Sequence, residues 1–183
     1  EAIESRARDD WERRDYQAAA GVVVEAYGPQ ILGYLVRTMR NHADAVEVFS
    51  DFCEDLCRGL PTFEARSSFW TWTYRVATRA RDRYWREPFR RRGERLATHA
   101  LGRLEQEVRS KTLQYLKTEV KDRSAALRER LSPEEQSLLT LRVDKEMSWA
   151  EIAEVLADEP EPLTEAGLKN CAASLRERFQ RLK

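Results

Sequence analysis

Residues 63–86 read FEARSSFWTWTYRVATRARDRYWR, a run in which aromatic residues give way to repeated arginines. From Thr71 onward the spacing predicts an amphipathic helix, because at about 100° per residue one set of residues falls on a single side. That set is Thr73, Val76, Ala77, Ala80 and Tyr84. The opposite side carries a ring within a basic stripe, made of Trp72, Arg75, Arg79, Arg83 and Arg86. Such a face can bind phosphates and stack a base, so the pattern favours a nucleic-acid interface.

The segment before this helix strengthens that hypothesis. Phe63, Phe69 and Trp70 fall in a predicted loop together with Ser67-Ser68. A loop that combines apolar rings with small hydroxyl groups can form a pocket for an unstacked base. The alternative is an ordinary amphipathic helix with arginines on its solvent face and Trp72 packed at the rim of the core.

Composition favours an all-α protein made of one ordinary domain or two small ones. The chain has 183 residues, of which 42% are hydrophobic, with seven Gly, six Pro and no alternating β-branched runs. Lys and Arg number 32, as do Asp and Glu, so the formal net charge is +0. Attraction to phosphate must therefore come from local segregation of charge.

Cysteine usage indicates a reducing compartment, since the count of three is odd. Cys53 and Cys57 lie one helical turn apart, but neither His42 nor His99 is at a zinc-site spacing, so we expect buried small side chains and no metal or cofactor. No apolar run approaches a membrane span and no signal peptide is evident, which predicts a soluble, cytoplasmic protein without a membrane partner. Because the sequence starts at Glu1 rather than Met, we expect a trimmed native start.

Two helical patterns between about Asp10 and Arg40 precede a third helix, which we expect Asp44 to cap and Arg58 to end. Its predicted buried stripe is Ala45, Phe49, Phe52, Cys53 and Leu56. Its other side is acidic, with Asp44, Glu47, Asp51, Glu54 and Asp55. That side is either a solvated surface or a docking stripe for a basic partner.

After Arg86 the helical pattern weakens until about Lys121, which predicts a linker. A second domain then shows capping boxes that begin at Ser132 and Ser148, and Thr164 can cap a last helix. The predicted buried stripe of that helix is Leu168, Cys171, Ala172, Leu175, Phe179 and Leu182. The residues facing away are Lys169, Ala173, Arg176 and Gln180. The outline is that of a helix-turn-helix, although any three-helix bundle has similar stripes.

Several motifs in one order resemble the extracytoplasmic-function (ECF) group of bacterial sigma-70 factors. Residues Phe63 to Ala77 resemble the FxxxSSFxTWxYRxA signature that closes region two of that family. The segment from Asp44 to Leu56 resembles its DAEDVVQEVFLRLW helix. Residues 131–142 resemble the start of region four, and residues 148–156 resemble its SYEEIAEVL helix.

The resemblance covers about residues 18–86 and 131–182 and implies an all-α fold of two small helical domains. Residues 1–88 would form a region-two bundle that binds the polymerase clamp and the minus-ten element. Residues 89–120 would be an interdomain linker, and residues 121–183 a region-four helix-turn-helix. The implied function is that of a sigma factor, not an enzyme, which directs core RNA polymerase to promoters and helps melt the minus-ten element for transcription initiation.

The resemblance also implies roles for individual residues. The residues expected to bind the clamp helices of the largest polymerase subunit are Asp44, Glu47, Asp51 and Asp55, and the main contacts are expected from Glu47 and Asp51. The residues expected to bind minus-ten DNA are Phe63, Ser67, Ser68, Trp72, Arg75, Arg79, Arg83 and Arg86. The residues expected to bind minus-thirty-five DNA are Trp149, Lys169, Asn170 and Arg176. Further expected partners are the polymerase flap and, as for many family members, an anti-sigma factor lodged between the two domains.

The sequence departs from the family pattern in both halves. Arg79 replaces the asparagine of the ARN motif, and Cys53 and Cys57 replace bulky rings of the clamp-contact helix. In region four an acidic insertion at residues 157–163 replaces the short ISPGTV turn. In the last helix, family members commonly have arginine, histidine and arginine at the three positions that are occupied here by Cys171, Ala173 and Ser174. Since a bidentate base contact contributes about 1–3 kcal/mol of discrimination, we expect weak minus-thirty-five recognition and promoter choice dominated by the first domain.

Two other functions fit parts of the sequence. A helix-turn-helix regulator acting without core polymerase would explain the second domain, but not the ring-rich loop or the acidic helix. A helical protein-binding adaptor would explain the zero net charge and the acidic patches, and would fail if the segment 61–86 binds single-stranded promoter DNA. An enzyme is disfavoured, because no paired carboxylates, nucleophile with base or Gly-rich phosphate loop occurs at a usable spacing.

Overall fold

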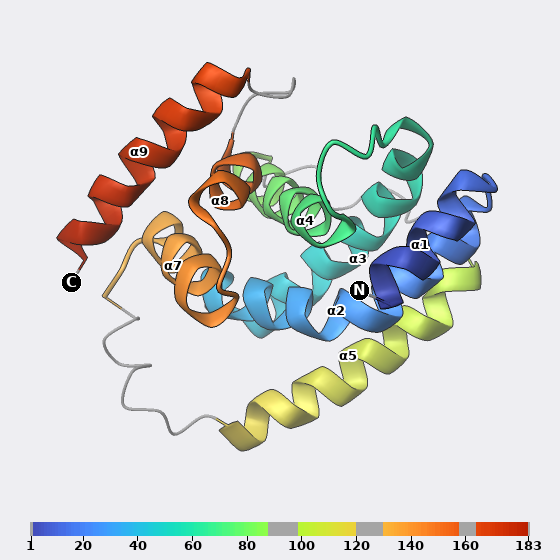
Figure 1. Cartoon of the computed structure of the whole chain (residues 1–183). Helices are drawn as coiled ribbons and strands as arrows, with labels where there is room; N and C mark the ends of the chain where they lie inside the picture. Colours follow the sequence, from blue (N-terminus) through green and yellow to red (C-terminus); the bar gives the residue numbers. More distant parts are fainter. Residues whose placement is uncertain (1, 88–98, 120–129, 158–163, 183) are drawn as a thin grey trace. The chain divides into compact units, whose positions relative to one another are not determined.

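A computed structural model describes residues 2–87, 99–119, 130–157 and 164–182, and all regular structure in these ranges is helical, which confirms the all-α prediction (Figure 1). The chain divides into two compact units, Glu1–Thr118 and Glu119–Lys183. The first contains α1 (Ala2–Glu12), α2 (Tyr16–Met39), α3 (His42–Gly59), the short 3-10 helix η1 (Leu60–Thr62), α4 (Phe69–Arg86) and most of α5 (His99–Glu119). The second contains α7 (Pro133–Leu139), the π-helical segment η2 (Thr140–Asp144), α8 (Trp149–Leu156) and α9 (Glu165–Arg181).

Helix α2 is the central element of the first unit and packs against α1, α3 and α4. It is a continuous helix of 24 residues, so its length and mean hydropathy of 1.2 would allow a membrane span, contrary to the prediction that no run approaches one. However, 61% of its most apolar window is buried inside the protein, as in the core helix of a soluble domain. Its fully buried side chains include Ile31, Leu32, Tyr34 and Leu35. Phe49 and Phe52 of α3 and Phe69 and Tyr74 of α4 are also fully buried, and the rings of Tyr34 and Tyr74 meet edge-on at 5.4 Å.

Two helix starts of the first unit differ from the predictions. The cap of α3 is Asn41, not Asp44, because the Asn41 Oδ1 atom accepts hydrogen bonds from the backbone N–H groups of Ala43 and Asp44. Helix α4 begins at Phe69 rather than Thr71, because Ser68 caps it by accepting from the Thr71 N–H at 3.0 Å. The predicted loop therefore ends at Ser68, two residues earlier than expected.

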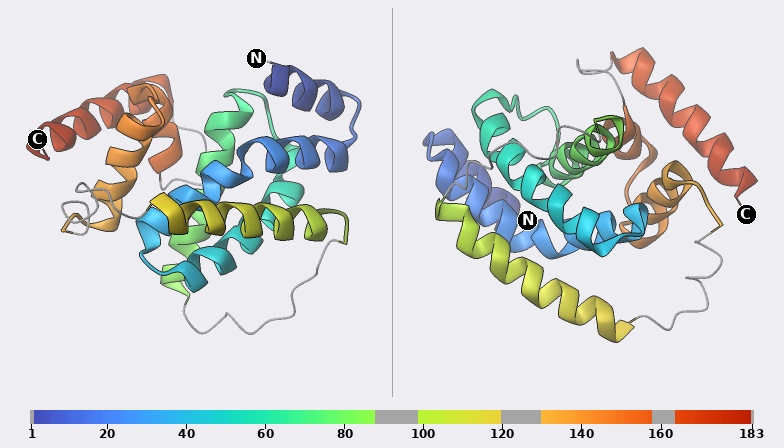
Figure 2. Two further views of the ribbon diagram at one scale, coloured as in Figure 1. Left: turned by 90° about the horizontal axis from the view of Figure 1, so that it is seen from below. Right: turned by 180° about the vertical axis from the view of Figure 1, so that it is seen from behind.

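Helix α5 lies within the range 89–120 for which the sequence predicts a linker, yet it clusters with the first unit. Val108 packs against α2 at Gly28, where an added Cβ would lie 3.1 Å from the Val108 Cγ1 atom. On α3 the Ser50 hydroxyl donates to the Glu105 carboxylate at 2.5 Å. Figure 2 shows α5 running beside α2. These contacts make α5 an additional layer on the bundle.

Both capping boxes predicted for the second unit are present, at Ser132 with Glu135 and at Ser148 with Glu151, and Thr164 caps α9. The stripe of α9 that the sequence predicts to be buried is the less exposed side of the helix but is mostly only partly buried. Only Leu175 of that stripe is buried, while its other members are partly exposed. The residues predicted to face away, Lys169, Ala173, Arg176 and Gln180, are all exposed.

Candidate nucleic-acid interface

A cluster of aromatic rings surrounds the loop between η1 and α4. The Phe63 ring packs against Phe69 at 4.7 Å, Trp72 at 4.8 Å and Trp11 of α1 at 5.7 Å between ring centroids. Phe63 is only 7% exposed, so its ring supports the loop, whereas Trp72 is partly exposed and can offer a ring for stacking. Ser67, which is also partly exposed, lies beside this cluster in the sequence.

One side of α4 carries the basic stripe at the predicted positions. Arg75, Arg79 and Arg83 are partly exposed and Arg86 is exposed. The Arg83 guanidinium pairs with Asp55 of α3 at 2.7 Å, with side chains 43% and 22% exposed. Arg83 therefore links the basic stripe to the acidic helix.

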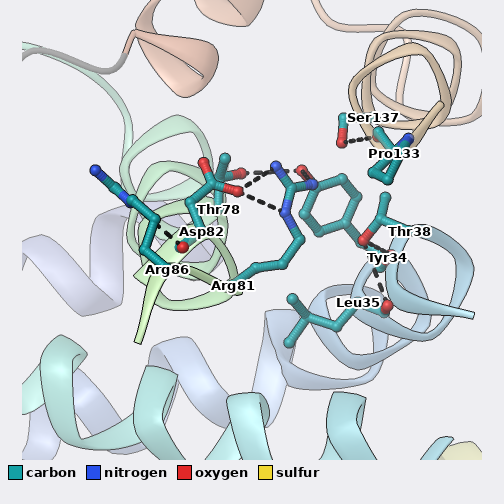
Figure 3. Close-up of polar contacts among 9 residues, drawn as sticks. All are labelled: Tyr34, Leu35, Thr38, Thr78, Arg81, Asp82, Arg86, Pro133 and Ser137. Atoms are coloured by element: carbon teal, nitrogen blue, oxygen red, sulfur yellow. Dashed lines mark hydrogen bonds and ion pairs between the residues drawn. The ribbon is translucent and has the colours of Figure 1, made fainter. Parts of the chain in front are cut away.

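Arg81 lies outside this stripe and has a structural role that the sequence did not reveal. It is 3% exposed and donates to the Tyr34 hydroxyl at 3.0 Å and to the Asp82 carboxylate at 2.7 and 2.8 Å (Figure 3). The Tyr34 hydroxyl also shares a hydrogen bond with the Thr78 hydroxyl at 2.9 Å. The indole of Trp85 lies 4.9 Å from the Arg81 guanidinium carbon. These contacts fix the rotation of α4 on α2, which leaves the arginines of the stripe partly or fully accessible to solvent.

The acidic face of α3 makes contacts with α4. Asp44 accepts from the Tyr84 hydroxyl at 2.7 Å, and Asp55 pairs with Arg83, so both carboxylates join α3 to α4. Glu47 and Asp51 lie on the same face between them and are partly exposed. Two of the four residues that the resemblance assigned to polymerase binding thus also hold the neighbouring helix.

Glu4 of α1 lies at the start of α4 and was not predicted as a site residue. Its carboxylate accepts from the Phe69 N–H at 3.0 Å, the Trp70 N–H at 2.9 Å and the Tyr27 hydroxyl at 3.0 Å. Burial, followed by the charge and hydrogen bond of Glu4, raises the pKa of Tyr27 above its ordinary value. No sequence motif marks Glu4, since its two backbone partners are 65 and 66 residues away.

The cysteines behave as small apolar side chains. Cys53 is buried against α5, and burial is the main cause that raises the pKa of its thiol, followed by the Glu105 carboxylate. Burial likewise raises the pKa of Cys57. Among the residues the structure describes, no group of three or more His, Cys, Asp or Glu side chains could hold a metal ion.

In the second unit Trp149 is surrounded by two arginines and a phenylalanine, and one of these arginines, Arg176, is a candidate DNA-binding residue. Arg142 and Arg176 lie with their guanidinium carbons 4.9 and 5.7 Å from the indole, and Phe179 meets it edge-on at 5.5 Å. Arg142 also donates to the Met147 carbonyl at 2.7 Å, a role that the sequence did not indicate. Lys169 pairs with Glu165 on the exposed side of α9 at 2.7 Å, and Asn170 is exposed beside it. Residues 158–163, most of the predicted acidic insertion, lie outside the described residues.

Comparison with known proteins gives two findings. The sigma-70 region 2 family matches residues 23–93, which include α3, the loop and α4. The RNA polymerase sigma factor YlaC of Bacillus subtilis (strain 168) is 31% identical over 133 residues. That alignment covers 71% of this chain and 75% of the relative.

Proposed function

Since this chain belongs to the extracytoplasmic-function group of the sigma-70 family, as an RNA polymerase sigma factor that acts in transcription initiation, we propose that its first unit both docks on the polymerase and opens the minus-ten element. The sigma-70 family binds core RNA polymerase and promoter DNA, and the acidic face of α3 and the basic face of α4 suit these two partners. In this assignment residues 1–88 carry the region-two functions. Residues 121–183 carry those of region four.

The observation that supports this most strongly is the row of at least partly exposed arginines on α4 next to Trp72 and the loop hydroxyls. Arg75, Arg79, Arg83 and Arg86 would hold the phosphates of the non-template strand. The loop through Ser67 and Ser68 would take a flipped base, with Trp72 as the exposed ring and Phe63 as its support. Stacking contributes about 1–3 kcal/mol per base, which offsets the few kcal/mol needed to unstack it. Melting would then need no ATP.

Polymerase docking is assigned to the acidic face of α3. Glu47 and Asp51 would contact the clamp helices of the largest subunit, because both are partly exposed carboxylates near the middle of this face. Asp44 and Asp55 belong to the same face, but their bonds to Tyr84 and Arg83 suit them to hold α4 in place. We therefore propose that these two aspartates support the polymerase face indirectly.

The second unit would contribute a weaker contact to the minus-thirty-five element. Trp149, Lys169, Asn170 and Arg176 are the proposed DNA-binding residues, and the polymerase flap is the proposed protein partner of this unit. An anti-sigma factor lodged between the two domains would control access to both. The protein would act in the cytoplasm, without catalysis of its own and without a metal or cofactor.

The separation of the two faces can be tested with Arg79→Ala. This change should reduce open-complex formation, which is measured by the permanganate reactivity of the minus-ten strand. It should leave the affinity for core polymerase unchanged, which is measured by fluorescence titration of labelled protein with core polymerase. Equal loss of both would contradict the division of roles, and absence of core binding by the wild-type protein would favour a regulator that acts without polymerase.

A further inference from the structure

Helix α1 contacts the proposed base pocket at both ends of the loop. At the start of the loop, the Trp11 indole N–H donates to the Leu60 carbonyl at 2.9 Å, and its ring meets Phe63 edge-on. At the end of the loop, the Glu4 carboxylate accepts from the N–H groups of Phe69 and Trp70. The loop is therefore held between two residues of one helix.

Glu4 completes the set of hydrogen bonds at the start of α4. The first two N–H groups of the helix bond to Glu4, the third bonds to the Ser68 hydroxyl, and the fourth, of Trp72, bonds to the Ser68 carbonyl. A carboxylate at this end of a helix also interacts favourably with the helix dipole. Tyr27 donates a third hydrogen bond to Glu4 and packs edge-on against Trp70 at 5.1 Å, which fixes the carboxylate from the side of α2.

Trp11 connects α1 to the exposed ring of the pocket. Its ring contacts Phe63, and Phe63 contacts Trp72 at 4.8 Å. Trp72 is also confined on the side of α3, where a Cβ added to Gly59 would lie 3.0 Å from its ring. The orientation of Trp72 thus depends on a chain of contacts that begins on α1.

We propose that Glu4 and Trp11 are positioning residues for the minus-ten pocket, through which α1 sets the conformation of the loop and the orientation of Trp72 before DNA arrives. The inference rests on the proposed function of the loop. Charge alone makes the opposite prediction, because removal of a carboxylate near the basic stripe should strengthen DNA binding. Loss of the Glu4 carboxylate should therefore weaken DNA binding if Glu4 positions the pocket, and should strengthen it if only its charge matters.

The test uses holoenzyme assembled from core polymerase and the full chain, with single-stranded non-template oligonucleotides that span the minus-ten element. Each nucleotide is replaced in turn by an abasic site to locate the flipped base. In the wild type the abasic site at that position should weaken binding about tenfold, the value of one stacked base. Glu4→Gln should weaken binding of the intact strand by about the same factor and should remove the further effect of the abasic site.

Glu12→Gln is the matched control, since it removes the same charge from an exposed position of the same helix. It should bind both strands as the wild type does or slightly more tightly. Trp11→Phe keeps a ring and removes the bond to Leu60, so it should give an intermediate loss confined to the intact strand.

Three outcomes would overturn the inference. In the first, Glu4→Gln and Glu12→Gln behave alike, which would leave charge as the explanation. In the second, Glu4→Gln weakens intact and abasic strands by the same factor or weakens core polymerase binding equally, which would indicate general disruption of the unit. In the third, no abasic site affects the wild-type holoenzyme, in which case the proposed pocket itself fails and this inference fails with it.

Discussion

Helices α4 and α9 are both expected to face promoter DNA, but they are held in different ways. They are similar in length, with 18 and 17 residues, and each begins after a hydroxyl cap. Nine residues of α4 are buried, whereas in α9 only Leu175 is buried. Hydrogen bonds and an ion pair also join α4 to α1, α2 and α3, through Glu4, Tyr34 and Asp55.

This difference indicates where binding energy is available. Side chains on a helix that is already fixed lose little freedom when DNA binds, whereas a weakly packed helix must be ordered at that moment. The α4 face is therefore preorganised for the minus-ten strand. The α9 face offers exposed Lys169 and Asn170, with Arg176 stacked near Trp149, and gains less from each contact.

The largest expected effect comes from removing two cationic side chains from each helix. Arg75→Ala with Arg79→Ala should reduce open-complex formation about 100-fold, since a hydrogen bond to a charged group contributes about 1.5 kcal/mol or more and 1.4 kcal/mol is tenfold. Lys169→Ala with Arg176→Ala should reduce it less than about tenfold. Permanganate footprinting at fixed salt measures both. Equal losses would remove the distinction between the two helices.

The two N-caps provide a second, smaller test with matched chemistry. Thr164→Ala should cost about 1 kcal/mol and should speed amide hydrogen exchange in the first turn of α9. Ser68→Ala should have a smaller effect on the first turn of α4, because Glu4 still bonds to the N–H groups of Phe69 and Trp70. Faster exchange at α4 than at α9 after these changes would contradict the account.

Removing one ion pair from each helix should give a third and smaller difference, in the free energy of unfolding. Asp55→Asn breaks a pair that joins two helices and should lower the free energy of unfolding by about 0.5 kcal/mol, within the range of partly exposed pairs. Glu165→Gln breaks a pair within α9 whose side chains are 86% and 74% exposed, and we expect a change near the limit of measurement. Denaturant unfolding of each variant would show whether this order is wrong.

Tyr27 should make the stability of the first unit depend on pH in alkaline solution. Its pKa is raised in the folded state, so above its ordinary value of 10.0 the unfolded chain loses the proton first and the free energy of unfolding falls as pH rises. Compared with Tyr27→Phe, the wild type should lose stability at up to about 1.4 kcal/mol per pH unit above pH 10. The residues of the second unit include no tyrosine. A constant difference between the two proteins from pH 8 to pH 12 would contradict the burial of this hydroxyl against Glu4.

The helix starts show which parts of the fold can be predicted from sequence. Ser132 and Ser148 were predictable because each capping box is complete within four residues. Asn41 and Asp44 are equally good caps three residues apart, and only the backbone path decides that Asn41 takes the role. The partial exposure of the α9 stripe could not be predicted either, because helical spacing gives the apolar side of a helix but not the area that covers it.

The candidate site shows the same division between local and distant information. The arginine stripe of α4 could be predicted from the helical period, since residues three or four positions apart lie on one side of a helix. The partners of Arg81 and Glu4 could not be predicted from the helical period, because Tyr34 is 47 residues from Arg81 and the backbone N–H of Phe69 is 65 residues from Glu4. The sequence also could not show that Asp44 and Asp55 bond to α4, since a row of carboxylates looks alike whether it faces solvent or a neighbouring helix.

Promoter choice should reside in the first unit, and run-off transcription with core polymerase on a promoter library randomised at both elements would measure this. We expect the selected promoters to share a minus-ten sequence. Changes at Arg75 and Arg79 should alter or abolish that selection, whereas Lys169→Ala with Arg176→Ala should leave it unchanged. A strong minus-thirty-five consensus that is lost in the Lys169 and Arg176 variant would contradict it.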